Sequence, residues 1–267
     1  MLKDITLGQY FPGDSVFHRM DPRTKLILVI LYIVALFQAT NFLSYAVMAL
    51  VTVTVIKISQ GPPKALVRGL KPIVIIIVLT AVLNMFYTDG HVIFQIWKLK
   101  LTVEGIIKAF FMVIRIVMLI CGTFLLTYTT APVALTDGLE LLLNPLKKLH
   151  VPVHEMSMMM SMALRFIPTL IEETDKIISA QKARGADFES GNLIQRAKAL
   201  LPILVPLFVS AFRRADELAI AMESRCYHGG EGRTRMKQLR YQRLDYTALL
   251  LGALMVAGMI AMRVMGL

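Results

Sequence analysis

The sequence predicts an all-α membrane protein with about five transmembrane helices and a cytosolic region of three further helices. Hydrophobic residues make up 56% of the 267 residues, which is too many for a soluble domain, yet charged residues still make up 18%. The apolar residues concentrate in five segments, and a long polar region separates the fourth segment from the fifth. This polar region contains two helix ends of similar sequence, so we expect it to be folded.

Five apolar segments are long enough, or nearly so, to cross a hydrocarbon layer of about 30 Å, which takes roughly 20 helical residues. They cover about residues 25–39, 42–58, 71–88, 106–130 and 245–265. The first two are short, and the Thr40-Asn41 turn between them indicates a helical hairpin.

The distribution of lysine and arginine predicts the orientation, because short basic loops stay in the cytosol. The turn after the first span has no basic residue, whereas Lys57, Lys64, Arg68 and Lys71 cluster after the second. We therefore expect the N-terminus and the polar region in the cytosol and the C-terminus outside. The first twenty residues lack an apolar core followed by a cleavage site, so we expect no signal peptide.

Prolines divide the polar region, because the residue before a proline avoids the helical conformation. The predicted helices lie near residues 133–148, 153–184 and 192–226. We expect the second helix to bend at Pro168 and the third near Pro202 and Pro206. The predicted domains are a membrane domain of four spans over residues 1–130, a cytosolic domain over 131–244 and a C-terminal transmembrane helix over 245–267.

The two long cytosolic helices end in related tripeptides, Ala183-Arg184-Gly185 and Ser224-Arg225-Cys226. When the arginines are aligned, upstream residues coincide. The matching pairs are Asp175 with Asp216, Ile177 with Leu218, and Ala180 with Ala221. The last two pairs lie seven and four residues before the arginine, and these offsets share one helical face. Each arginine therefore ends an apolar stripe and can enter a groove on a cytosolic partner.

A simpler explanation of each arginine is helix capping, since a cation suits a helix C-terminus and glycine suits the left-handed cap. The repetition favours docking. A guanidinium binds a carboxylate with two hydrogen bonds, and two similar helix ends require two similar grooves. A pair of ATP-binding-cassette (ABC) ATPase subunits offers such grooves. The sequence has no Gly-x-x-x-x-Gly-Lys-Ser/Thr motif, so if ATP energy is used, it must come from another subunit.

These motifs resemble the T component (EcfT) of energy-coupling-factor (ECF) type ABC transporters. Ala183-Arg184-Gly185 matches the family's Ala-Arg-Gly motif fully, and Ser224-Arg225-Cys226 keeps its arginine. Two further segments are similar to the family, His18-Arg19-Met20-Asp21-Pro22-Arg23-Thr24-Lys25 and Arg165-Phe166-Ile167-Pro168. The likeness covers nearly the whole chain.

The resemblance implies a non-catalytic coupling subunit in the cytoplasmic membrane of a prokaryote, with the three cytosolic helices as coupling helices. Two ABC ATPase subunits, of the EcfA and EcfA′ type or a homodimer, would carry ATP and Mg²⁺, and this chain would bind no cofactor. An S component would bind the vitamin or other micronutrient. The residues expected to dock on the ATPases are Ala183, Arg184, Gly185, Ser224, Arg225 and Cys226.

A methionine cluster begins the second coupling helix. It consists of Met156, Met158, Met159, Met160 and Met162. Unbranched, polarizable side chains repack easily and suit contacts with several partners, so we interpret the cluster as a contact for the S component. The alternative is that these methionines fill the space between the coupling helices, and both interpretations can hold for different residues.

Several other functions fit the sequence less well. Pro152 separates His150 from His154, which argues against a zinc site, and Glu172-Glu173 lacks the partner histidines of an intramembrane protease. The net charge of +11 comes without the aromatic-interleaved basic motif of a nucleic-acid binder. We therefore expect no metal site, no enzyme and no nucleic-acid partner.

The principal alternative is a self-contained secondary transporter or channel with a cytosolic regulatory region. Such a protein needs polar groups in mid-membrane or an inverted repeat. Arg115 is the one charged residue well inside a predicted span, and it either extends toward the outer surface or has a function. A structural scaffold is a second alternative, and it predicts that the two arginines can be changed without stopping transport.

Overall fold

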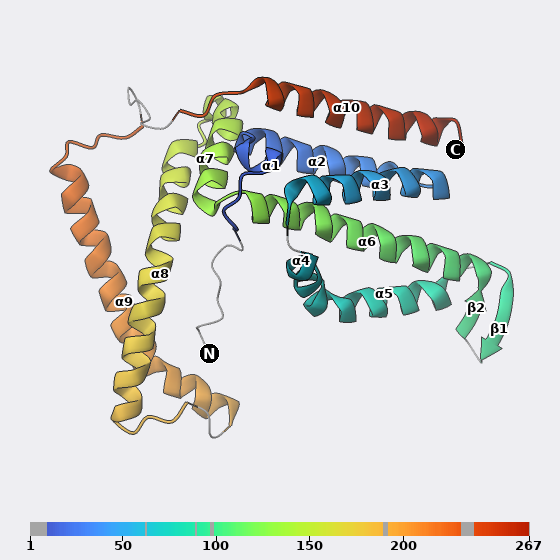
Figure 1. Cartoon of the computed structure of the whole chain (residues 1–267). Helices are drawn as coiled ribbons and strands as arrows, with labels where there is room; N and C mark the ends of the chain where they lie inside the picture. The colour runs from blue at the N-terminus through green and yellow to red at the C-terminus, as the bar shows by residue number, and fades with distance from the viewer. Residues whose placement is uncertain are drawn as a thin grey trace. The chain divides into compact units, whose positions relative to one another are not determined.

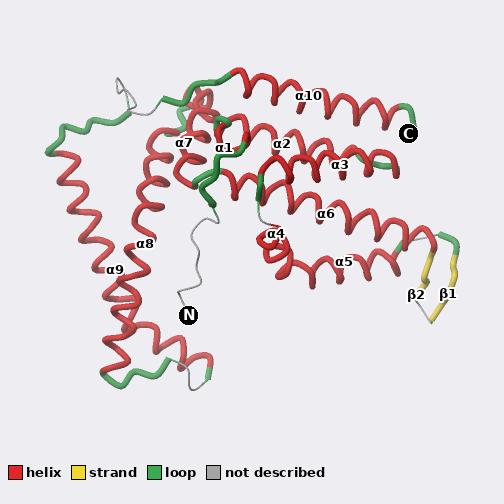
Figure 2. The backbone as a smooth tube through the Cα atoms, in the orientation of Figure 1, coloured by secondary structure: helices red, strands yellow, loops and turns green. Residues whose placement is uncertain are grey.

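The computed structural model is built almost entirely of helices, which confirms the predicted all-α class (Figures 1 and 2). It describes residues 10–61, 63–88, 90–96, 99–188, 192–230 and 238–266. The chain forms two compact units. We call Gly8–Leu139 together with Leu239–Leu267 the bundle unit, and Glu140–Gln238 the crossed-helix unit.

The bundle unit combines the first part of the chain with its last helix. Its elements are α1 (Val16–Arg19), α2 (Pro22–Gln38), α3 (Phe42–Ser59), α4 (Pro63–Leu70), η1 (Lys71–Ile73), α5 (Val74–Tyr87), the antiparallel strands β1 (Val92–Ile96) and β2 (Leu99–Thr102), α6 (Val103–Thr129) and α10 (Arg243–Val264). Helix α7 (Pro132–Leu143) runs across the boundary. The crossed-helix unit continues with η2 (Asn144–Leu149), α8 (Val153–Ala183) and α9 (Leu193–Glu223).

All five predicted spans form helices. By length and composition, the described residues contain four stretches that could cross a membrane, Phe42–Ser59, Val103–Thr129, Ile194–Glu223 and Arg243–Val264. Lys71–Tyr87 is a shorter apolar helix, and α2 has 17 residues. Ile194–Glu223 belongs to α9, which the sequence analysis assigns to the cytosol. The membrane-protein class is confirmed, while the number of spans stays a prediction.

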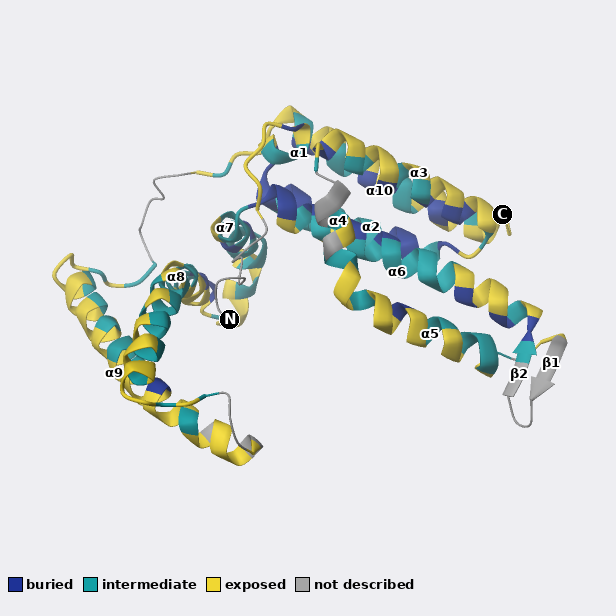
Figure 3. Ribbon diagram, turned by 60° about the horizontal axis from the view of Figure 1, so that its bottom comes forward, coloured by how far each residue is buried: buried dark blue, intermediate teal, exposed yellow. Residues whose placement is uncertain are grey.

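Four helices of the bundle unit, α2, α3, α6 and α10, share one apolar core. Its buried members are Ala35, Leu36, Ala39, Tyr45, Met48, Met118 and Met259. Small residues allow close packing, because a Cβ atom added at Gly252 of α10 would lie only 2.7 Å from Leu28 of α2. The outward faces of α5 and α10 expose large apolar residues (Figure 3), as expected for helices whose solvent is lipid.

Arg115 has a structural explanation. Its Nη2 atom donates a 2.9 Å hydrogen bond to the carbonyl of Ala39, which ends α2. Its guanidinium carbon lies 5.7 Å from the Phe37 ring centre and 5.5 Å from that of Tyr45. A cation at a helix C-terminus and over two aromatic rings is electrostatically favourable. The side chain is therefore held inside the bundle by the end of α2.

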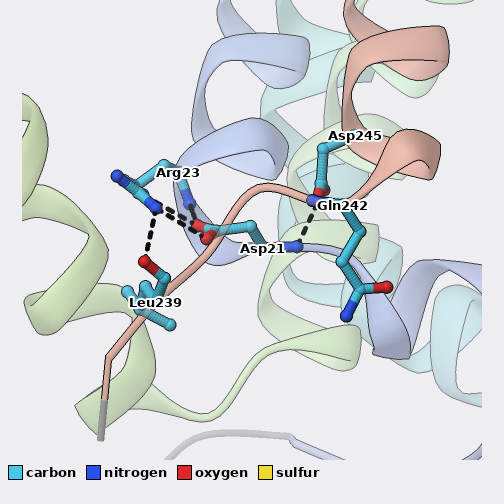
Figure 4. A network of polar contacts seen from close by, with 5 residues as sticks. All are labelled: Asp21, Arg23, Leu239, Gln242 and Asp245. Atoms are coloured by element: carbon cyan, nitrogen blue, oxygen red, sulfur yellow. Dashed lines mark hydrogen bonds and ion pairs between the residues drawn. The ribbon is translucent and has the colours of Figure 1, made fainter.

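A polar network centred on the buried residues Asp21 and Asp245 joins the start of α10 to the start of α2 (Figure 4). One carboxylate oxygen of Asp245 accepts a 2.9 Å bond from the Asp21 amide, and the other accepts a 2.7 Å bond from the Gln242 amide. Asp21 in turn pairs with Arg23 at 3.0 Å, and Arg23 donates to the Leu239 carbonyl at 3.0 Å. We call these five residues the Asp245 clasp.

The clasp depends on a charge that solvent does not reach, since Asp245 is 0% exposed. Both carboxylate oxygens are hydrogen-bonded, which offsets the cost of burying them. The far end of α10 is also fastened, because the Asn41 side chain at the start of α3 donates to the Gly266 carbonyl at 2.9 Å. The last helix of the chain is thus tied to the first part of the bundle at both ends.

We expect Asp245→Asn to lower the free energy of unfolding by about 2 kcal/mol, because an amide NH₂ would face a backbone N–H and a charged hydrogen bond would be lost. Asp216→Asn, at an exposed position on α9, is the matched control and should leave stability nearly unchanged. Thermal and denaturant unfolding of the detergent-solubilised chain measures both. Equal stability of the two variants would contradict the role given to the clasp.

Candidate functional site

The candidate site lies in the crossed-helix unit, where α8 and α9 run antiparallel and cross (Figures 1 and 2). Near the end of α8, the Gln181 side chain donates to the Pro202 carbonyl of α9 at 3.3 Å. Helix α8 continues through Pro168 and α9 through Pro202 and Pro206, and α9 visibly changes direction along its course. The antiparallel arrangement puts the two C-terminal ends at opposite ends of the pair.

The six predicted docking residues therefore form two separate sites, which we call the first tip (Ala183-Arg184-Gly185) and the second tip (Ser224-Arg225-Cys226). Met222, next to the second tip, lines the same groove as Met158 near the start of α8. About 26 residues of helix separate Met158 from Arg184, so the tips lie on the order of 40 Å apart at about 1.5 Å per residue. Only a partner with two distant grooves can hold both.

Both tips close with the same backbone cap. At the first tip the Ala186 amide donates to the Gln181 carbonyl at 3.0 Å, and the Gly185 amide donates to that of Lys182 at 3.0 Å. At the second tip the equivalent bonds, Tyr227 to Met222 and Cys226 to Glu223, measure 3.0 and 2.8 Å. This pair of bonds is the Schellman motif. Each arginine is the last residue before the left-handed position.

The left-handed residue differs between the tips. Gly185 has φ of +86°, and Cys226 has φ of +55°. An L-residue pays about 1–2 kcal/mol in this conformation, whereas glycine does not. The departure of Ser224-Arg225-Cys226 from the glycine-containing motif therefore leaves the backbone geometry unchanged and adds strain at Cys226.

Both arginines are available to a partner. All six tip residues are exposed. Among the residues that the structure describes, neither the Arg184 nor the Arg225 guanidinium makes a hydrogen bond or an ion pair. A Cβ atom added at Gly185 would meet nothing within 4 Å, so the space beside the first tip is open. The arginines end their helices without folding back onto the described residues.

An ion pair fastens the two helices near the middle of α8. Arg214 of α9 donates to Glu173 of α8 at 2.6 Å. A hydrogen bond from Ser210 and the charge of Arg214 hold the pKa of Glu173 below its usual value. Glu173, which the sequence analysis weighed as a protease residue, is therefore a link between α8 and α9. Sequence alone could not find the pair, because its members lie 41 positions apart.

The methionine cluster divides between a groove and the surface. Met158, Met159 and Met162 line a groove of about 370 Å³ between α8 and α9, opposite Leu218 and Met222. The most exposed methionines of the cluster are Met156 (47%), Met159 (59%) and Met160 (43%). The cluster therefore contributes both to the groove wall and to the exposed surface of α8.

The two histidines weighed as metal ligands are kept apart. His150 precedes α8 and has φ of +60°, whereas His154 lies in the first turn of α8. The Nδ1 atom of His154 lies 3.0 Å from a carboxylate oxygen of Glu140. Within the described ranges, no three histidine, cysteine, aspartate or glutamate side chains gather where they could hold a metal ion.

Comparison with known proteins gives a consistent result. Residues 13–236 match the family described as Cobalt transport protein. A protein of Thermosediminibacter oceani is 56% identical over 98% of this chain and 99% of its own length. Proteins of Clostridium kluyveri and Bacillus subtilis are 54% and 49% identical, over 99% and 97% of this chain and 98% of each relative. All three are named energy-coupling factor transporter transmembrane protein EcfT.

The two caps should respond oppositely to substitution. Gly185→Ala should destabilise the first tip by about 1 kcal/mol, because the Cβ atom of alanine causes steric strain at a positive φ. Cys226→Gly should relieve strain and stabilise the second tip. Hydrogen exchange of the Ala186 and Tyr227 amides measures each effect, and Gly258→Ala within α10 is the control. Faster exchange at Tyr227 in Cys226→Gly would contradict the shared cap.

The Glu173 link should weaken in acid. Because the pKa of Glu173 is lower in the folded than in the unfolded chain, the link contributes stability above about pH 4.5, and this contribution is lost as the pH falls through the folded pKa. The pair is partly exposed, so the effect should be at most about 1 kcal/mol. Between pH 7 and pH 3, the free energy of unfolding should fall less in Glu173→Gln than in the exposed control Glu172→Gln. Identical profiles would show that the link contributes nothing.

Proposed function

This chain belongs to the EcfT family of energy-coupling factor transporter transmembrane proteins, and on that premise we propose that it is the membrane coupling subunit of an ECF-type ABC importer. In this proposal two ABC ATPase subunits bind and hydrolyse ATP with Mg²⁺. A separate S component binds a vitamin or another micronutrient. This chain joins the ATPases to the S component and performs no bond chemistry itself.

The observation that carries the proposal is the pair of free arginines in matching caps at opposite ends of α8 and α9. A dimeric or pseudodimeric ATPase presents two related grooves that are separated in space, and each groove receives one tip. A charged hydrogen bond contributes about 1.5–3 kcal/mol, and a guanidinium forms two with one carboxylate. Two tips on one pair of helices bind more tightly than either alone.

Movement of the ATPases reaches both helices together. The Gln181 bond to α9 lies three residues before Arg184, and the Arg214 bond to α8 lies further along the same interface. A force on the first tip therefore acts directly on α9 as well as on α8. We propose that this coupled displacement of the crossed helices drives the S component to release its substrate.

The S component contacts the methionine cluster in this proposal. Met156 and Met160 expose apolar surface on α8, and so does Met159, which lines the groove together with Met158 and Met162. Methionine side chains adjust their shape at small cost, so one surface can accept S components of different sequence. The proposed location is the cytoplasmic membrane of a prokaryote, with the N-terminus and the coupling helices in the cytosol and the C-terminus outside.

A self-contained transporter or channel has less support. The charged residue that such a mechanism would use, Arg115, is bonded to the end of α2 and lies over Phe37 and Tyr45. Its guanidinium has a structural role that requires no solute.

Charge reversal at the tips tests the proposal. We expect Arg184→Glu combined with Arg225→Glu to abolish co-purification of the ATPase pair, because each new carboxylate would repel the acidic group that an arginine binds. Arg213→Glu, an exposed position on α9, is the control and should retain the ATPases. Stoichiometric ATPase with the double variant would overturn the proposal.

Cys226 gives an independent readout in the same complex. It is exposed beside Arg225, whereas Cys121 is buried. Maleimide labelling of Cys226 should be fast in the isolated chain and slow when the ATPases are bound. Equal labelling rates in the two states would place the second tip outside the interface.

A further inference from the structure

The bundle unit contains a cavity of about 500 Å³ that the coupling function does not use. Helices α1, α2, α3, α6 and α10 all contribute to its walls. Most lining residues are aliphatic or aromatic. The polar ones are Lys25, Tyr32, Thr52, Thr129 and Thr247.

The polar groups of the cavity are already hydrogen-bonded within the bundle. The Lys25 ammonium donates to the Thr129 carbonyl and the Thr130 hydroxyl at 3.0 Å each. The Tyr32 hydroxyl lies 2.7 Å from that of Thr52 and donates to the Met118 carbonyl at 3.1 Å. The Thr247 hydroxyl likewise donates a hydrogen bond to the carbonyl of Leu244. A ligand of this cavity is therefore recognised by its apolar surface.

The shape of the cavity matches a lipid chain. The helices that line it lie side by side in the bundle (Figures 1 and 3). Its lining extends along α10 from Leu244 to Met255, about 16 Å at 1.5 Å per residue. One leaflet of a hydrocarbon layer is about 15 Å deep, half of the ~30 Å core. The wall is open to the side, because the lining residues Val16, Ile58 and Leu251 are 47%, 44% and 66% exposed.

Three basic residues stand next in sequence to lining residues at the end of the cavity formed by α1 and the start of α10. Arg19, Lys57 and Arg243 are exposed, and each is one residue from a lining residue, namely Met20, Ile58 and Leu244. None of the three side chains makes a hydrogen bond or an ion pair with the described part of the chain. Asp21 and Asp245 are buried in the clasp, and Asp14, two residues before the lining residue Val16, is an exposed acid at this end. Three exposed basic residues against the one exposed acid Asp14 leave the mouth with a net positive charge.

We propose that this cavity binds one acyl chain of an anionic phospholipid, with the phosphate at Arg19, Lys57 and Arg243. The acyl chain lies between α10 and the neighbouring helices and fills space that the protein side chains leave open. Lipid tails are as apolar as leucine. The transfer free energy of an acyl chain from the bilayer to the cavity is therefore small. Head-group charge therefore decides which lipid occupies the site.

Native mass spectrometry of the full chain tests the proposal. The probe is a vesicle of equal parts phosphatidylglycerol and phosphatidylcholine, from which the protein is extracted in mild detergent. We expect one phosphatidylglycerol to remain bound in preference to phosphatidylcholine. Arg19→Gln with Arg243→Gln should reduce this preference about 30-fold. Equal retention of both lipids by the wild-type chain, or retention of free fatty acid alone, would overturn the proposal.

A second pair of variants tests the cavity itself. Ala248 lines the cavity and Ala253 is exposed elsewhere on α10. Ala248→Phe should fill the cavity and eliminate the bound lipid, whereas Ala253→Phe should retain it. A lipid adduct that persists in Ala248→Phe would show that the lipid binds outside this cavity. The double arginine variant leaves the packing of the helices untouched, so it decides the question if Ala248→Phe fails to fold.

Discussion

The bundle depends on one buried carboxylate, that of Asp245. Segments more than 200 residues apart meet at its two oxygens, which bind the amides of Asp21 and Gln242. A charge without solvent is costly unless it is fully hydrogen-bonded, so the clasp forms only when α2 and α10 lie in one register. Gly252 then allows the two helices to pack closely along their length.

The clasp also determines where the polar part of the chain returns to the bundle. The Arg23 guanidinium, held by Asp21, binds the carbonyl of Leu239 and lies 4.1 Å from the ring centre of Tyr241. Leu239 is the first residue of the bundle unit after the crossed-helix unit. The described chain therefore re-enters the bundle unit at a residue that Arg23 binds.

The two tips show that backbone geometry can be repeated where the sequence is not. Glycine at the first tip and cysteine at the second both adopt a positive φ, and both caps have the same pair of hydrogen bonds. What the tips share is the placement of an exposed arginine immediately before the left-handed turn. A partner that reads this geometry can accept either tripeptide, which is why the proposal gives both arginines the same role.

The helices, the family and the positions of both tips could be predicted from the sequence. Those features depend on local signals, namely apolar periodicity, prolines at helix ends and a residue that suits the left-handed cap after each arginine. The contacts between distant residues became known from the tertiary structure. It paired Glu173 with Arg214, bonded Arg115 to the end of α2, buried Asp245 against Asp21 and put the tips at opposite ends of α8 and α9. Such pairings depend on how helices pack across long intervals of chain, and a single sequence contains no local signal for them.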